Sequence, residues 1–190
     1  MINILIVGIC IAMFIISVFM PQLYYYFALW PNLFTNMPWQ VITSIFMHAG
    51  ITHLLVNMLV LFIFGTYLEN IVGSKKYLII FLFSGIIGNL AYIAYAYFTG
   101  DYNPSVGASG AIFGIMGALA ILAPHLRVVV FPLPIPVNIR VAVIIFALID
   151  LILLPYSLKT GIAHITHLAG LITGLIFGKL LYRKMDVRYY

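Results

Sequence analysis

Six long apolar runs constrain the fold of this chain more than any other feature of its sequence. They cover, to within a few residues, 3–20, 52–71, 77–98, 105–124, 137–155 and 162–182. Each run approaches the roughly 20 residues that a helix needs to cross about 30 Å of hydrocarbon. Only 7% of the residues are charged, too few to cover the surface of a water-soluble domain. The sequence therefore predicts an all-α membrane protein, with residues 1–190 forming a single domain of six transmembrane helices.

The segment between the first two runs, residues 21–51, is long and rich in aromatic residues and prolines. It contains Trp30, Trp39 and three consecutive tyrosines at 24–26. Aromatic side chains of this kind gather at the membrane interface. We expect a first loop that inserts partly into the bilayer without spanning it. The first run lacks a basic leading segment and a clear cleavage site, so we predict a span there and not a signal peptide.

Lysine and arginine are distributed unequally over the two sides of the predicted bundle. If the chain starts in the cytoplasm, Lys159 is the one basic residue on the outer side. The inner side then holds Lys75, Lys76, Arg127, Arg140, Lys179, Arg183, Lys184 and Arg188. Positively charged loops remain preferentially in the cytoplasm. We predict a multi-pass protein of the cell membrane with both termini in the cytoplasm and the first loop outside.

Glycines recur in two of the runs at intervals that suit close helix packing. The run at 162–182 contains three glycines spaced by four residues, and the run at 105–124 contains a similar series. The glycines are Gly170, Gly174 and Gly178 in the first, and Gly107, Gly110, Gly114 and Gly117 in the second. Faces of small residues let two membrane helices approach closely. We expect these two helices to touch, with the glycines acting mainly in packing.

A short set of polar side chains interrupts the apolar runs. Such groups are costly inside a bilayer, so each one is a functional candidate. The set comprises His48, His53, Asn57, Ser109, Asp150, His164 and His167. In the predicted topology, three different runs place members of this set roughly 5–12 Å below the outer surface. Scattered polar substitutions would not be expected to share one depth.

Ser109 and His167 are predicted to act as a nucleophile and its base. Ser109 is expected about one turn inside its helix, between Gly107 and Gly110, which leave its hydroxyl uncrowded. A serine needs an adjacent base to act as a nucleophile, and the two glycine faces would bring His167 beside it. Backbone N–H groups near the start of that helix, and its positive end, favour an oxyanion. Phe113, one turn after Ser109, is expected to pack on the ring of His167 or to fill the core.

His53 and Asn57 are candidates for an oxyanion hole. They lie four residues apart, and therefore on one face of the helix at 52–71. Both side chains can donate hydrogen bonds, as stabilisation of an oxyanion requires.

Metal and cofactor chemistry is less well supported by the residues. His164-x-x-His167 and the pair of His48 and His53 could suggest zinc. No H-E-x-x-H motif is present, however, and no carboxylate lies near these histidines in the sequence. We predict no metal, no cofactor and no nucleic-acid partner. Asp150 could orient His167 as the third member of a triad, but a role in capping a helix or contacting the interface is favoured.

Three motifs, taken in order, resemble the rhomboid intramembrane serine proteases. They are His48-x4-His53-x3-Asn57, Gly107-x-Ser109-Gly110, and His167-Leu168-Ala169-Gly170 followed by Gly174. Gly65, Leu68-Glu69 and Gly73 also look like that family's pattern, and the similarity covers roughly residues 39–178.

The resemblance implies a six-helix rhomboid-like bundle with a Ser–His dyad and no obligatory acid. By motif match, Ser109 would be the nucleophile and His167 the general base. His53 and Asn57 would stabilise the oxyanion with the Ser109 backbone N–H, while His48 would help to shape the first loop and the site. The implied activity is an intramembrane serine endopeptidase opening toward the outer face, with transmembrane segments as substrates and the helix at 137–155 as a lateral gate.

The chain departs from the family's pattern at two positions. The first loop has Trp39-Gln40 where the family often has Trp-Arg, so any anchoring ion pair of that arginine is absent. Phe113 stands where the family often has tyrosine, which keeps the ring and loses the hydroxyl. Neither change removes a catalytic atom.

Two other functions stay open from the sequence. A rhomboid-like pseudoprotease would bind membrane helices without cleaving them, although such proteins usually lack the serine or the histidine that this chain keeps. A proton-coupled transporter could use the buried histidines. It is disfavoured by the absence of internal repeats and by the scarcity of buried carboxylates.

Overall fold

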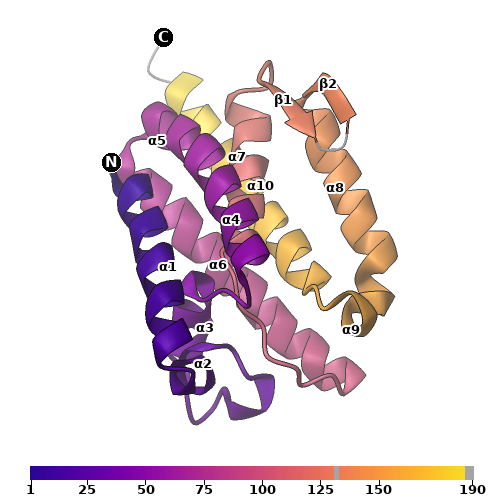
Figure 1. Ribbon diagram of the computed structural model, residues 1–190. Helices are drawn as coiled ribbons and strands as arrows, with labels where there is room; N and C mark the ends of the chain where they lie inside the picture. Colours follow the sequence, from indigo (N-terminus) through magenta and orange to yellow (C-terminus); the bar gives the residue numbers. More distant parts are fainter. Residues whose placement is uncertain (131–132, 187–190) are drawn as a thin grey trace.

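The computed structural model describes residues 1–130 and 133–186, and this part of the chain is mostly helical, as predicted (Figure 1). A helical segment covers most of each of the six apolar runs. The segments are α1 (Ile2–Phe19), α4 (Ile51–Val60) continued by η3 (Leu61–Gly65) and α5 (Thr66–Val72), α6 (Ser74–Thr99), α7 (Ser109–Leu122), α8 (Ile139–Leu153) continued by η4 (Leu154–Tyr156) and α9 (Ser157–Thr160), and α10 (His164–Asp186).

Among the six segments that cover the apolar runs, α7 is the shortest, and its start corrects one sequence-based boundary. Five of the helical segments are long and apolar enough to cross a membrane, whereas α7 has 14 residues. The predicted run at 105–124 therefore starts too early, because the helix begins at Ser109 itself. Gly107 has φ +126°, a conformation that glycine adopts readily and that separates the preceding loop from the helix.

The first loop contains four short helices, none long enough to span a bilayer. They are α2 (Gln22–Phe27), η1 (Pro31–Leu33), α3 (Gln40–Thr43) and η2 (Ser44–Phe46). Gln40 is buried and connects parts of this loop. Its Oε1 accepts the backbone N–H of Trp30 at 3.1 Å, and its Nε2 donates to the carbonyl oxygen of Tyr25 at 2.9 Å. Neutral hydrogen bonds thus hold the loop at the position where the family often has arginine.

A buried polar cluster joins the start of α1 to α5 and to the π-helical turn η3. The Glu69 carboxylate accepts the backbone N–H of Ile2 at 2.7 Å and that of Asn3 at 2.9 Å. The side-chain amide of Asn3 donates to the carbonyl oxygen of Leu61 at 3.1 Å, in the π-helical turn η3. A π-turn takes carbonyl groups out of the α-helical hydrogen-bond register. The cluster therefore satisfies backbone groups that burial would otherwise leave unpaired.

The helices α7 and α10 pack against each other along the two glycine faces, as expected. A Cβ atom on Gly174 would overlap the carbonyl oxygen of Gly114, and one on Gly170 would overlap that of Gly110. The two backbones therefore touch directly, as small residues allow in membrane helices. Figure 1 shows this pair between α6 on one side and α8 on the other.

A two-stranded hairpin, which the sequence did not predict, connects α7 to α8. Its antiparallel strands are β1 (Arg127–Val130) and β2 (Leu133–Asn138). Asn138 caps α8 by accepting the backbone N–H of Arg140 at 2.9 Å. The Nε of Arg140 donates to the carbonyl oxygen of Ala120 at 2.9 Å, near the end of α7. The hairpin and this hydrogen bond hold the end of α7 beside the start of α8.

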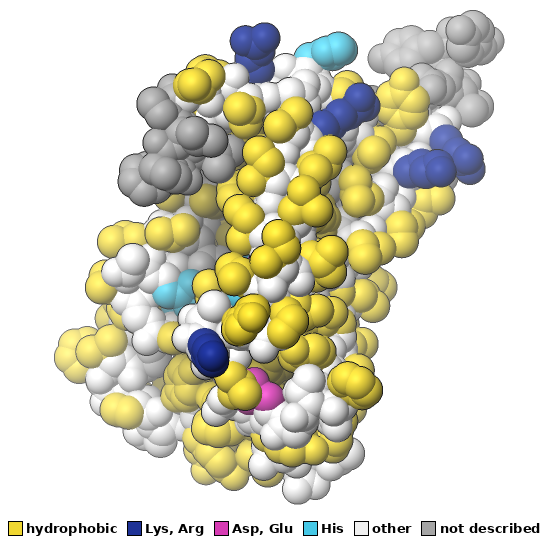
Figure 2. Space-filling model, turned by 90° about the vertical axis from the view of Figure 1, so that its right-hand side faces the viewer, with side chains coloured by type: hydrophobic (Ala, Val, Ile, Leu, Met, Phe, Trp, Pro, Cys, Tyr) yellow, Lys and Arg dark blue, Asp and Glu magenta, His cyan; other side chains and the backbone are white. Residues whose placement is uncertain are grey.

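The two ends of the bundle differ in charge. One end, here called the basic end, contains the start of α1, the α5–α6 junction with Lys75 and Lys76, and the hairpin with Arg127 (Figure 1). Lys159 belongs to α9, at the opposite end. Figure 2 shows basic side chains gathered at one end of a largely hydrophobic surface. Arg188 and the side chain of Lys184 lie outside the described residues.

Candidate active site

Three helices present polar side chains from their first turns. His53 is the third residue of α4, Ser109 the first of α7, and His167 the fourth of α10. All three helices start at the ends that face away from the basic end (Figure 1). Ser109 opens its helix and does not lie one turn inside it, which corrects the expected position. The backbone N–H groups in the first turn of α7 have no acceptor within that helix and can therefore bind an anion.

The side chains of Ser109 and His167 are in direct contact. Ser109 Oγ lies 2.8 Å from His167 Nε2, within hydrogen-bond distance. The close approach of α7 and α10 at Gly110 and Gly170 produces this contact between residues 58 positions apart in the sequence. A serine hydroxyl hydrogen-bonded to an imidazole is the arrangement that a serine nucleophile requires.

The ring of Phe113 lies parallel to the ring of His167. The ring centroids are 4.4 Å apart and the planes differ by 7°. Phe146 of α8 also contacts Phe113 in an edge-on arrangement, with ring centroids 6.2 Å apart. The imidazole can therefore turn little about its side-chain bonds, because one face is covered by Phe113 and one edge is bound to Ser109.

His53 lies against the loop that leads to Ser109. A Cβ atom at Gly107 would come within 2.8 Å of the His53 ring, so only glycine fits there without displacing the ring. Asn57 donates one amide hydrogen bond to the backbone carbonyl of His53, at 2.8 Å. An amide has two N–H donors, so one donor of Asn57 remains. The ring of His48 contacts that of His53, with centroids 5.2 Å apart.

The environment of His48 gives a testable pH dependence. Burial, and next the proximity of His53, lower the pKa of His48 from 6.5 to about 4. Because the pKa is lower in the folded state, the unfolded chain binds more protons between these two values, and the free energy of unfolding falls as the pH drops through them. We expect a loss of roughly 3 kcal/mol, at about 1.4 kcal/mol per pH unit. Thermal unfolding in detergent at pH 7 and pH 4.5 measures it. The pH effect should be smaller in His48→Gln, and equal effects in both proteins would contradict the assignment.

Asp150 does not cap a helix, as the sequence-based interpretation favoured, because its hydrogen bonds go to the side chains of two histidines. Its side chain is buried, with 4% of the residue exposed. Its Oδ1 lies 3.1 Å from His167 Nδ1 and 2.5 Å from His164 Nδ1. The carboxylate thus contacts the nitrogen of His167 that faces away from Ser109.

The same three residues are the best candidates for metal ligands among those described. One ligand atom from each of Asp150, His164 and His167 lies within 4.8 Å of the others. Asp150 is distant from the two histidines in the sequence but lies beside them in the fold, so a carboxylate is present near them. The separations themselves are typical of hydrogen bonds, since ligand atoms around a tetrahedral zinc ion lie about 3.3 Å apart.

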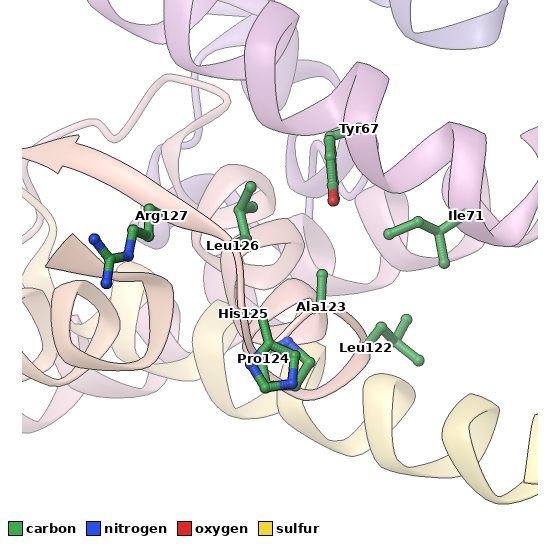
Figure 3. Close-up of a pocket in the computed structure, with 8 residues that line it drawn as sticks. All are labelled: Tyr67, Ile71, Leu122, Ala123, Pro124, His125, Leu126 and Arg127. Carbon is green, nitrogen blue, oxygen red and sulfur yellow. The ribbon is translucent and has the colours of Figure 1, made fainter. Parts of the chain in front are cut away.

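A separate hollow of about 510 Å³ lies at the basic end, between α5 and the turn that follows α7 (Figure 3). It is lined by Tyr67, Ile71, Leu122, Ala123, Pro124, His125, Leu126 and Arg127. None of the candidate site residues belongs to it.

Comparison with known proteins agrees with the motifs. The rhomboid domain matches residues 35–184. The putative rhomboid protease YdcA of Bacillus subtilis (strain 168) is 36% identical over 151 residues, covering 80% of this chain and 71% of that protein. Rhomboid protease GluP of the same bacterium is 44% identical over 85 residues, or 45% of this chain and 16% of that protein. The mitochondrial rhomboid protein 1 of Saccharomyces cerevisiae is 33% identical over 149 residues, or 77% of this chain and 42% of that protein. The chain therefore matches less than half the length of the last two relatives.

Proposed function

Because this chain belongs to the rhomboid family of multi-pass membrane proteins, we propose that it is an intramembrane serine endopeptidase. Its substrates are transmembrane segments of membrane proteins, with Ser109 as the nucleophile and His167 as the general base. The observation that carries the proposal is the 2.8 Å contact between Ser109 Oγ and His167 Nε2 inside an apolar helix bundle. A polar pair in such surroundings is energetically costly, which makes it a functional candidate.

The reaction follows from this contact. Ser109 Oγ attacks the scissile carbonyl carbon while its proton passes to His167 Nε2. His167 then gives that proton to the leaving amine as the peptide C–N bond breaks, which leaves an acyl ester on Ser109. A water molecule deprotonated by His167 attacks the ester, releases the new carboxyl end and restores the serine hydroxyl.

The oxyanion formed at each step is stabilised by donors around Ser109. The backbone N–H of Ser109 is free at the start of α7, where the helix dipole also favours negative charge. His53 approaches from α4, and Asn57 supplies its remaining amide N–H from the next turn. Each such donor typically contributes about 10²–10³-fold to the rate.

We place the basic end in the cytoplasm, so that the site opens toward the outer face of the cell membrane. The positive-inside rule supports this orientation, with Lys75, Lys76 and Arg127 at one end and Lys159 at the other. A substrate helix approaches sideways and unwinds locally beside Ser109. The side of the site where α8 contacts it through Phe146 and Phe113 is the proposed gate.

An activity-based probe tests the assignment directly. A fluorophosphonate added to membranes that contain the protein is expected to label Ser109, because His167 activates the hydroxyl. Ser109→Ala and His167→Ala should show no labelling. Ser105→Ala is the matched control, since Ser105 lies on the preceding loop and pairs with Leu29 through backbone atoms. Labelling that persists in Ser109→Ala, or a wild-type protein that never reacts, would count against the proposal and favour a helix-binding function without catalysis.

A further inference from the structure

A series of hydrogen-bonded side chains extends behind His167, on the side away from Ser109. His167 Nδ1 lies 3.1 Å from Oδ1 of Asp150, a residue of α8. The same oxygen lies 2.5 Å from His164 Nδ1, at the start of α10. The other ring nitrogen of His164 lies 3.0 Å from Thr160 Oγ1, at the end of α9. The path therefore runs from Ser109 to Thr160 without a gap.

The ionised form of the Asp150 carboxyl group would fix the proton positions along this path. An ionised carboxylate can only accept hydrogen bonds, so both Nδ1 atoms that contact Asp150 must carry a hydrogen. Neutral His167 then has its lone pair on Nε2, directed at the hydroxyl of Ser109. This is the tautomer that a general base needs. The result is the same whether His164 is neutral and accepts from Thr160 or is protonated and donates to it.

The burial of the pair shows that its hydrogen bonds matter energetically. Asp150 is 4% exposed and His164 is 2% exposed. A carboxylate inside a bilayer is costly unless polar partners surround it. Both hydrogen bonds found for Asp150 go through Oδ1, and its Oδ2 has no partner among the described residues. The two histidines therefore determine how the carboxylate is oriented.

We propose that Asp150, held in place by His164, is a positioning residue that acts through His167. It fixes the tautomer and orientation of the imidazole and stabilises the imidazolium formed when Ser109 loses its proton. Asp150 does not take that proton, which stays on Nε2 until it passes to the leaving amine. The inference rests on the proposed protease function. It replaces the expected Ser–His dyad by a Ser–His pair whose histidine is held by the Asp150 carboxylate.

Substitution of Asp150 tests the proposal, because a positioning residue should affect kcat much more than KM. In vesicles with a reporter substrate that has one transmembrane helix, Asp150→Asn should lower kcat by about 10²–10⁴-fold and leave KM within about 3-fold, because an amide can donate to Nδ1 and favour the wrong tautomer. Asp150→Glu keeps the charge and should recover part of kcat. Asp101→Asn is the matched control, because Asp101 is also mostly buried and lies outside the path.

A second pair of variants tests the role of His164 and keeps the proposal falsifiable if Asp150→Asn folds poorly. The amide nitrogen of asparagine stands where Nδ1 of histidine does, so His164→Asn should retain most of kcat. His164→Leu has no donor and should lower kcat by at least 10-fold. Equal kcat values for His164→Asn and His164→Leu would overturn the positioning role of His164.

The activities of the Ser109 and Asp150 variants together show whether the positioning role, the protease function or both are wrong. If Ser109→Ala is inactive while Asp150→Asn keeps the wild-type kcat, the positioning role fails and the protease function stands. If Ser109→Ala still cleaves the substrate, both fail. A kcat loss in Asp150→Asn that tracks a lower unfolding midpoint, with no recovery in Asp150→Glu, means a purely structural role and overturns the inference. Wild-type activity that a chelator removes and zinc restores would reveal a metal site at Asp150, His164 and His167 instead.

Discussion

Replacing Ser109 by alanine is expected to lower the rate of cleavage of a transmembrane reporter substrate by roughly 10⁴-fold or more. His167→Ala should have an effect of similar size, because the two side chains act as one unit through their 2.8 Å contact. The double variant should therefore be little worse than either single variant. Gel analysis of the products after reconstitution in vesicles gives the rate.

The control for the histidine is His125→Ala, which changes a residue of the hollow at the basic end. It should cleave the substrate at the wild-type rate. Unfolding midpoints of all variants in detergent show whether a loss of rate reflects chemistry or folding. A Ser109→Ala protein that is folded and still cleaves at more than about 1% of the wild-type rate would remove Ser109 from the mechanism.

Replacing Gly174 by alanine is expected to separate α7 from α10 and to abolish activity. The new Cβ atom would overlap the carbonyl oxygen, carbonyl carbon and Cα atom of Gly114, and a backbone cannot move aside as a flexible side chain can. Overpacking typically costs about 1–3 kcal/mol and sometimes more. Here the helix displacement would also lengthen the contact between Ser109 and His167. The measurements are the unfolding midpoint in detergent and the labelling of Ser109 by a fluorophosphonate.

Gly8→Ala is the matched substitution, since a Cβ atom at Gly8 of α1 meets no heavy atom within 4 Å. Its unfolding midpoint and labelling should stay at the wild-type level. If Gly174→Ala behaved like Gly8→Ala in both measurements, the direct backbone contact would have no bearing on stability or on the site.

The parts of the fold that the sequence predicted are those set by local patterns. A stretch of apolar residues forms a helix in a bilayer wherever it lies, because backbone groups there must be paired within the segment. Glycines at a spacing of four create a flat face on one helix, so the contact at Gly170 and Gly174 followed from spacing alone. That contact also explains why the sequence predicts the pairing of Ser109 with His167.

The contact between Asp150 and His167 could not be predicted from residue spacing. Spacing along one helix tells which residues share a face, but α8 and α10 are joined through η4, α9 and a left-handed turn at Gly161 with φ +66°. The direction in which such a turn returns the chain is not encoded in periodicity. The sequence does not predict the hairpin for a different reason. Prolines such as Pro136 in β2 argue against a strand.

The short length of α7 has a consequence for how the protein relates to its lipid. The end of α7 is fixed at the basic end by the hairpin and by the hydrogen bond from Arg140 to Ala120. Fourteen residues then place Ser109 about 21 Å from that end, at 1.5 Å per residue. The length of α7 sets this distance, which therefore does not change with the thickness of the bilayer. Longer or shorter acyl chains would move the far headgroups relative to Ser109. Under the proposed protease function, lipid thickness would thereby set which peptide bond of a given substrate helix comes level with the hydroxyl.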